Sequence, residues 1–178
     1  MKLKDVLKGR IPDKLLEYVP SSFEIIGSRE KAIAIVEIDE KLEKYKKIIA
    51  HAIMEVHKNV VTVLRKISER CGEFRIRKYE ILIGNETEVI HKEYGYKLLV
   101  DVTKVYFSPR LAAERMRVAE QIEEGSIVVD MFAGVAPFSL IIAKYAMPKR
   151  IYAIDKNPYA IKYARENVRI NEMENIIE

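Results

Sequence analysis

The sequence predicts an α/β fold in two domains, a small α+β domain at residues 1–104 and the first part of a Rossmann-like domain at residues 105–178. Two observations predict the second domain. The short apolar run Ile127–Asp130 enters a turn of small residues at Ala133-Gly134, and a second apolar run further on ends in Asp155. Parallel strands with these endings are typical of a nucleoside-binding sheet. The short strands and helices upstream suit a separate α+β domain.

Three helical segments are expected in the first domain. Apolar spacing in residues 3–18, interrupted at Gly9 and Pro12, predicts two short amphipathic helices. Asp39 is placed to cap a longer helix, which runs to about Lys58 and carries one apolar face.

Short apolar runs between turn signals predict the strands of the first domain. They are Phe23–Ile26, Ala32–Ile38, Val60–Leu64, Tyr79–Ile83, Glu86–His91 and Tyr96–Val100. A turn at Gly27 favours a hairpin between the first two strands. The last three strands are expected to form a meander that turns at Gly84-Asn85 and Tyr94-Gly95. The polar and basic stretch Arg65–Lys78 is expected to be an exposed connection.

The second domain opens with the crossing segment Val105–Pro109 and a helix from about Leu111 to Glu123. Further helices are expected from Pro137 and from Pro158, because proline suits the first turn of a helix. A doubly wound sheet needs about five to seven strands, and two have appeared by the end of the sequence. We therefore expect a fragment of a longer polypeptide, since a two-stranded sheet otherwise needs a partner to cover its edges.

Composition narrows the functional classes. The net charge of +4 permits a polyanionic partner without requiring one. A single cysteine, Cys71, excludes an intramolecular disulfide and fits a reducing compartment. Because no apolar run reaches membrane-spanning length and no signal peptide is recognisable, we expect a cytoplasmic protein without membrane contact. His51, His57 and His91 lack metal-ligand spacing, so no metal is expected.

The turn after Asp130 and the acidic strand end together predict a nucleoside site. Small residues let a ligand approach the backbone, and the carboxylate of Asp155 would accept hydrogen bonds from both ribose hydroxyls. A dinucleotide site wants three glycines, whereas only Gly134 is present here. A smaller ligand with one ribose and an amino-acid tail, such as S-adenosylmethionine, fits better. The alternative is an ordinary strand–helix connection with no ligand.

Three motifs resemble those of one known family. They are Gly72-Glu-Phe-Arg-Ile-Arg77, Tyr106-Phe-Ser-Pro-Arg-Leu-Ala-Ala-Glu-Arg115 and Val129-Asp-Met-Phe-Ala-Gly-Val-Ala-Pro-Phe138. In this order and spacing they resemble the archaeal and eukaryotic tRNA guanine-37 N1-methyltransferases over nearly the whole chain. The resemblance implies a class I methyltransferase domain, S-adenosylmethionine as the cofactor, the anticodon stem-loop of tRNA as the partner, and a monomer when the chain is complete.

Related readings stay open beside this one. A sister family, the aminocarboxypropyl transferases of wybutosine synthesis, shares the scaffold and the cofactor but usually lacks the Arg-Leu-Ala-Ala-Glu-Arg form seen here. A bifunctional relative that also methylates a wyosine precursor belongs to the methyltransferase branch. A truncated tRNA-binding fragment without catalysis is the third reading.

The resemblance also implies roles for single residues. Glu114 matches the family's proposed general base for the N1 proton of guanine, and Arg75 matches the residue that stabilises negative charge on O6. Without the resemblance, Glu114 would be a solvated helix residue paired with Arg110 or Arg117, and Arg75 one more charge in a basic loop. The residues implied to bind the cofactor are Phe107, Asp130, Phe132, Ala133, Gly134, Val135, Pro137, Phe138, Asp155, Lys156 and Asn157.

Contacts to tRNA are expected from the basic stretch and from the segment that borders the target-base pocket in the family. An aromatic ring there can stack on an unstacked base, and cations can meet phosphates. The residues concerned are Arg65, Lys66, Arg70, Arg77, Lys78, Tyr106, Ser108 and Arg110. Their alternative roles are a solvated loop and a buried strand end.

The chain departs from the family's pattern at a few positions. Ala136 stands where members commonly have glycine, which adds a methyl group near the cofactor's amino-acid end. Ala112 and Ala113 stand where glycine often precedes the glutamate. The family's Asn-Pro-Pro-like loop, which lines the target-base pocket, is expected beyond Glu178.

Overall fold

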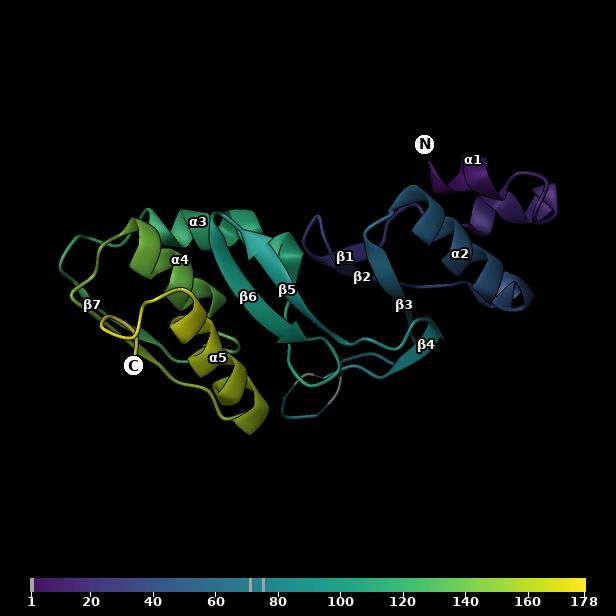
Figure 1. Ribbon diagram of the computed structural model, residues 1–178. Coiled ribbons are helices and arrows are strands. Elements are labelled where there is room, and N and C mark those ends of the chain that lie inside the picture. The colour runs from purple at the N-terminus through teal and green to yellow at the C-terminus, as the bar shows by residue number, and fades with distance from the viewer. Residues whose placement is uncertain (1, 71, 75) are drawn as a thin grey trace. The chain divides into compact units, whose positions relative to one another are not determined.

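The computed structural model describes residues 2–70, 72–74 and 76–178, and the chain divides into two compact units (Figure 1). Unit 1 contains residues up to 70 together with 77–89. Unit 2 contains the described residues between 72 and 76 together with 90–178. The division at residues 89–90 lies earlier than the boundary at 104 that the sequence predicted.

Unit 1 contains one four-stranded sheet in the order β1-β2-β3-β4. Its strands are β1 (Glu24–Gly27), β2 (Ala32–Val36), β3 (Val60–Lys66) and β4 (Tyr79–Ile83). The β1–β2 and β3–β4 pairs are antiparallel, whereas β2 and β3 are parallel. The parallel pair needs a crossover connection, which the helices between β2 and β3 supply. The predicted hairpin of β1 and β2 is confirmed.

Helices cover this sheet. They are α1 (Leu3–Leu7), the 3₁₀ helices η1 (Asp13–Tyr18) and η2 (Glu40–Tyr45), and α2 (Lys46–Val56). Asp39 caps η2, because its side chain accepts a 2.9 Å hydrogen bond from the Lys41 amide. The predicted continuous helix from Asp39 is therefore wrong in its first part, where the chain forms a 3₁₀ helix. Tyr45, with φ −108° and ψ 2°, ends the 3₁₀ helix and is the N-cap residue of α2.

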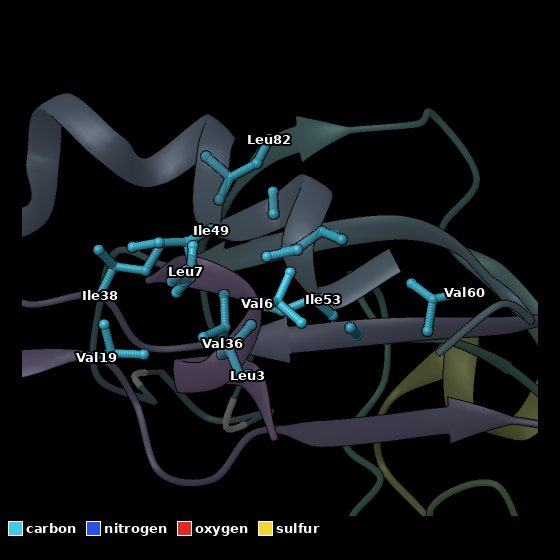
Figure 2. Close-up of a cluster of buried hydrophobic side chains, with 14 of the residues drawn as sticks. Leu3, Val6, Leu7, Val19, Val36, Ile38, Ile49, Ile53, Val60 and Leu82 are labelled. Atoms are coloured by element: carbon cyan, nitrogen blue, oxygen red, sulfur yellow. The ribbon is translucent and has the colours of Figure 1, made fainter. Parts of the chain in front are cut away.

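The core of unit 1 lies where α1 and α2 meet the sheet (Figure 2). Leu7 from α1 and Ile49 and Ile53 from α2 are fully buried beside Val36 of β2. Every residue of β2 is buried, and because successive side chains of a strand point to opposite faces, both faces of β2 are covered. Burial of each such side chain stabilises the folded state by about 1.5–3 kcal/mol, so this core is the main source of the stability of unit 1.

The predicted meander is wrong at its first turn. β4 pairs with β3, and the next strands, β5 (Glu88–Glu93) and β6 (Tyr96–Asp101), form a separate two-stranded sheet. The second turn is confirmed: Tyr94 and Gly95 have φ of 42° and 73°, as a two-residue hairpin of this hand requires. At Gly84 the chain instead leaves the first sheet.

Unit 2 holds a parallel pair of strands, connected by a helix and followed by another. Its elements are η3 (Pro109–Leu111), α3 (Ala112–Ala119), β7 (Ile127–Asp130), α4 (Pro137–Tyr145), β8 (Arg150–Ala153) and α5 (Pro158–Ile170). Residues 176–178 add a third extended segment, because the Ile151 amide donates to the Ile176 carbonyl at 2.8 Å and the Glu178 amide to the Ile151 carbonyl at 2.9 Å. The sequence did not predict this segment.

The hairpin of β5 and β6 belongs with unit 2 because α5 lies along β6 (Figure 1). Asn167 of α5 bonds the backbone of Leu99, and Asn171, the C-cap residue of the helix, bonds that of Lys97. These contacts explain why the units divide before β6 rather than after it. Over the described ranges, no helix has the length and apolar character needed to cross a membrane.

Candidate functional site

The turn between β7 and α4 is fastened to the end of β8. The Ala133 amide donates to the Ile154 carbonyl at 2.9 Å, and the Ile154 amide donates to the Asp130 carbonyl at 2.8 Å. The parallel pairing of the two strands brings their carboxyl ends to the same edge. The two features that predicted a nucleoside site therefore lie side by side.

Asp155 links these features directly. Its Oδ2 accepts a 2.7 Å hydrogen bond from the Gly134 amide, and its Oδ1 accepts a 2.8 Å bond from the Asn157 amide. A carboxylate offers about four acceptor positions, so each oxygen retains capacity for a further donor. The carboxylate is thus fixed by the backbone on both oxygens and can still accept hydroxyl hydrogen bonds.

Gly134 lies close to the segment that contains Tyr106. It has φ 57°, in the left-handed region that favours glycine. A Cβ built at this position would meet, among the described residues, only the Tyr106 carbonyl oxygen within 4 Å, at 3.9 Å. A side chain at this position would therefore reach ordinary van der Waals contact with the Tyr106 carbonyl, so this segment lies close against the turn.

A cavity of about 430 Å³ adjoins the same residues. Gly134 and Asp155 border it, with Ala133, Ala153 and Ile161 among its apolar wall residues. Ligand pockets commonly measure about 300–1,000 Å³ and combine apolar walls with a few polar groups. The cavity is thus of ligand size and carries the predicted ribose acceptor at its edge.

Asp130 has a visible structural task. The Ser139 hydroxyl donates to its Oδ2 at 2.8 Å, across the first turn of α4. Burial raises the pKa of Asp130, and the hydrogen bond from Ser139 opposes that shift. The N-cap residue Ala136 has no side-chain oxygen to cap α4. The first turn of the helix is instead held by the bond between Ser139 and Asp130.

The remaining predicted cofactor residues differ in exposure. Phe132 is 88% exposed, Lys156 is exposed and forms an ion pair with Glu73, and Pro137 and Phe138 are half-buried. Ala133, Val135, Asn157 and Phe107 are buried. Asn157 accepts from the Tyr159 amide at 3.0 Å as the N-cap of α5 and donates to the Lys104 carbonyl at 3.2 Å. Ala136 is also fully buried, so its methyl group does not reach the solvent-exposed surface of the turn.

Glu114 lies on the exposed face of α3. Arg117 donates to it from Nη2 at 2.6 Å and from Nε at 2.8 Å, and this pairing lowers the pKa of Glu114 below its usual range. The carboxylate is therefore ionised at neutral pH. Arg75, the second residue with an expected chemical role, lies outside the described residues.

The predicted tRNA contacts do not form one exposed loop. Arg65 and Lys66 are the last residues of β3, where Arg65 pairs with Glu43 and Lys66 donates to Glu24 at 3.1 Å. Arg77 lies 3.5 Å from Glu69, and its Nε is buried without a hydrogen-bond partner among the described residues.

Others in the predicted set are more accessible. Lys78, Tyr106 and Arg110 are exposed, and Arg70 is half-buried. Ser108 is buried, and its carbonyl accepts from Arg115 Nη1 at 3.2 Å. The three exposed residues are thus the members of the set best placed to meet a large partner.

Sequence reasoning missed a buried polar cluster in unit 2. Arg115, only 1% exposed, donates to Glu93 through Nε at 2.8 Å and Nη2 at 2.6 Å. Tyr96 donates to the same carboxylate at 2.6 Å, and the ring of His91 lies 5.0 Å from that of Phe107. The cluster holds the Phe107–Ser108 segment, because Arg115 lies 5.2 Å from the centre of the Phe107 ring and donates to the Ser108 carbonyl. β5 buries alternate residues and so places Glu93 on its inner face, but the sequence of this strand shows no matching alternation of apolar residues.

Protonation of this cluster is set by opposing effects. Burial acts to raise the pKa of Glu93, but hydrogen bonds from His91, Arg115 and Tyr96 outweigh it and lower the pKa to about 2. Across the described ranges, no group of three or more His, Cys, Asp or Glu side chains is arranged to hold a metal ion.

A parallel strand pair with a one-glycine turn against an acidic strand end defines a Rossmann-like nucleoside-binding domain. Residues 89–178 match the TRM5/TYW2 methyltransferase domain, and residues 3–87 match the TYW2 N-terminal domain. The chain belongs to this TRM5/TYW2 family.

Individual relatives agree with this assignment. The tRNA (guanine(37)-N(1))-methyltransferase Trm5b of Pyrococcus abyssi is 51% identical over 94% of this chain and 49% of its own length. A tRNA(Phe) (4-demethylwyosine(37)-C(7)) aminocarboxypropyltransferase of Pyrococcus horikoshii is 38% identical over 97% of this chain and 60% of its own. A solved complex of aTrm5 with tRNALeu has a TM-score of 0.86 at 38% identity, covering 100% of this chain and 52% of that one. The chain spans about half the length of the methyltransferase relatives it matches.

The Glu93 cluster gives a prediction for acid stability. The folded pKa of about 2 lies below the ordinary value of 4.5, so the ionised carboxylate stabilises the fold above about pH 4.5 and loses this effect as the pH falls towards 2. Glu93→Gln should lower the free energy of unfolding at neutral pH by about 3 kcal/mol and flatten its decline from about pH 5 to about pH 3. Urea unfolding over this pH range measures both effects.

Glu120→Gln, at the exposed end of α3, is the control and should keep the wild-type pH profile. A Glu93→Gln profile parallel to wild type would show that the cluster does not hold an ionised carboxylate.

Proposed function

We propose that the protein transfers a methyl group from S-adenosylmethionine to N1 of guanine 37 in tRNA. The observation that carries this proposal is the 2.7 Å bond between the Gly134 amide and Asp155, at the border of a cavity of about 430 Å³. The methyltransferase relative at 51% identity and the tRNA-bound structure at TM-score 0.86 support it. We place the protein in the cytoplasm, where its tRNA substrate is found, acting as a monomer.

S-adenosylmethionine, when bound, supplies a methyl group on an electrophilic sulfonium centre. Asp155 would accept the ribose hydroxyls with its remaining lone pairs, because the Gly134 and Asn157 amides already orient it. The turn at Ala133–Val135 would receive the amino-acid end, since Ala133 and Gly134 border the cavity. Exposed Phe132 and half-buried Phe138 would add apolar contacts.

Glu114 would act as the general base. Guanine N1 carries a proton and becomes a nucleophile only when that proton leaves, and an ionised carboxylate within hydrogen-bond reach can accept it. The Arg117 partner keeps Glu114 ionised and would have to yield one carboxylate oxygen to the substrate. Arg75 would stabilise the negative charge that develops on O6.

The α+β domain and the Tyr106 segment would hold the anticodon stem-loop. Tyr106 would stack on the target base and Arg110 would meet a nearby phosphate, with Ser108 fixing the segment between them. Arg65 and Lys66 already form ion pairs within the protein, so they would contribute less to tRNA binding than the exposed cations. Lys78 would make the exposed phosphate contact, together with Arg70 and Arg77.

A second candidate is aminocarboxypropyl transfer to a wyosine precursor, which the 38% identical relative supports. It uses the same cofactor and attacks a different carbon. A tRNA-binding role without catalysis is the third candidate.

Product analysis tests the leading proposal. The full-length protein, incubated with S-adenosylmethionine and unmodified tRNA, should yield S-adenosylhomocysteine and 1-methylguanosine, measured by mass spectrometry of both fractions. Methylthioadenosine as the cofactor product would instead establish aminocarboxypropyl transfer. Tight tRNA binding with no product from the cofactor would support the binding-only role.

The proposed base makes a second prediction. Glu114→Gln should lower the turnover number roughly a hundredfold or more, because the amide cannot take the N1 proton, while the Kd for S-adenosylmethionine stays near the wild-type value. Single-turnover kinetics and calorimetry measure the two quantities.

Glu166→Gln is a matched control. Glu166 accepts from Arg169 at 2.6 and 2.9 Å in the same three-residue spacing on α5, so this variant removes an equivalent surface ion pair. Equal turnover in both variants would remove Glu114 from the role of base.

The proposed phosphate contact makes a third prediction. Lys78→Ala should weaken tRNA binding and reduce the slope of log K against log salt by about 1, since one fewer counterion is released. Lys162→Ala removes another exposed positive charge, on α5, and should leave the slope unchanged. Filter binding across a salt series compares them, and identical slopes for wild type and Lys78→Ala would exclude the contact.

A further inference from the structure

Asn167 of α5 is fully buried and joins two parts of unit 2. Its Oδ1 accepts from the Leu99 amide at 2.6 Å, and its Nδ2 donates to the Leu99 carbonyl at 3.1 Å. The same Nδ2 donates to the Val135 carbonyl at 3.0 Å. One side chain therefore binds the backbone of β6 and the backbone of the turn that follows β7.

Asn171 repeats half of this arrangement one helical turn later. Its Oδ1 accepts from the Lys97 amide at 2.9 Å, and its Nδ2 donates to the Lys97 carbonyl at 2.7 Å. Residues four apart on a helix are separated by about 6 Å of rise, and residues two apart on a strand by about 6.6 Å, so the amides match alternate residues of β6. Asn171 does not share the bond to the turn, because its other donation goes to the Asn167 carbonyl.

The carbonyl that Asn167 holds lies in a strained part of the turn. Ala136, the next residue, has φ 67° and ψ 32°, a left-handed conformation that a Cβ disfavours. Such a conformation persists where surrounding contacts fix it. Here the Ala136 amide donates to the Ala133 carbonyl at 2.8 Å, and Asn167 holds the Val135 carbonyl, which belongs to the same peptide group as that amide.

We propose that Asn167 is a positioning residue for the cofactor turn. By holding the Val135 carbonyl it keeps the Gly134 amide directed at Asp155, and it fixes the turn to the hairpin of β5 and β6. It acts through the backbone and does not touch the cofactor. This inference rests on the proposed function, in which the turn binds S-adenosylmethionine.

The pair of asparagines offers a matched test. Asn167→Ala and Asn171→Ala each remove two bonds to β6, but only Asn167→Ala releases the turn. In the full-length protein, calorimetric titration below the unfolding midpoint of each variant should show the Kd for S-adenosylmethionine raised about five- to tenfold by Asn167→Ala. Asn171→Ala should stay within about twofold of wild type, and the Kd for tRNA should be equal in both variants.

Equal cofactor affinities in the two variants would overturn the inference and leave the proposed function standing. Failure of the wild-type protein to bind S-adenosylmethionine would overturn both.

A measurement on the unaltered protein covers the case in which Asn167→Ala does not fold. The side-chain amide signals of Asn167 in a nitrogen-15 spectrum should shift on addition of S-adenosylmethionine, together with the Gly134 backbone signal, while those of Asn171 stay in place. A shift of Gly134 without one of Asn167 would contradict the positioning role.

Discussion

The geometry of the candidate site depends on one carboxylate. Asp155 accepts from the Gly134 amide with one oxygen and from the Asn157 amide with the other, so it joins the turn after β7 to the start of α5. Carboxylates bonded by backbone donors form strong, charge-assisted hydrogen bonds. Asn157 also caps α5 and donates to the Lys104 carbonyl. The contacts around Asp155 therefore orient both α5 and the chain segment that leads to Tyr106.

A second layer of buried polar groups lies behind that region. The Arg115–Glu93 pair and the Asn167 clamp each connect the hairpin of β5 and β6 to the rest of unit 2, one through the Ser108 carbonyl and the other through the Val135 carbonyl. Both use hydrogen-bonded polar side chains in place of apolar packing. Directional bonds of this kind hold particular backbone atoms in place, whereas apolar contacts fix shape more loosely.

Sequence patterns were informative where the signal is local. The hairpin of β1 and β2, the turn of Tyr94 and Gly95, and the strand–turn–helix around Gly134 are confirmed, because turn residues and period-two alternation act over a few positions. Alternation shows which face of a strand is buried but not which strand pairs with it, so β4 and β5 were wrongly joined. The burial of Arg115 could not be predicted from the sequence either, because it depends on an ion pair with Glu93, which lies far away in the chain.

The division of the chain into interleaved pieces has a consequence for dissecting it. The described residues between 72 and 76 belong with unit 2, although unit 1 supplies the sequence on both sides of them. The backbone therefore passes between the units three times, and no single cleavage site yields two complete folding units. A fragment that ends after β4 would contain the segment between residues 72 and 76, which belongs to unit 2. A fragment that starts at β5 would lack that segment. Proteolysis or gene truncation between the two units should therefore also disrupt the folding of the unit that loses a segment.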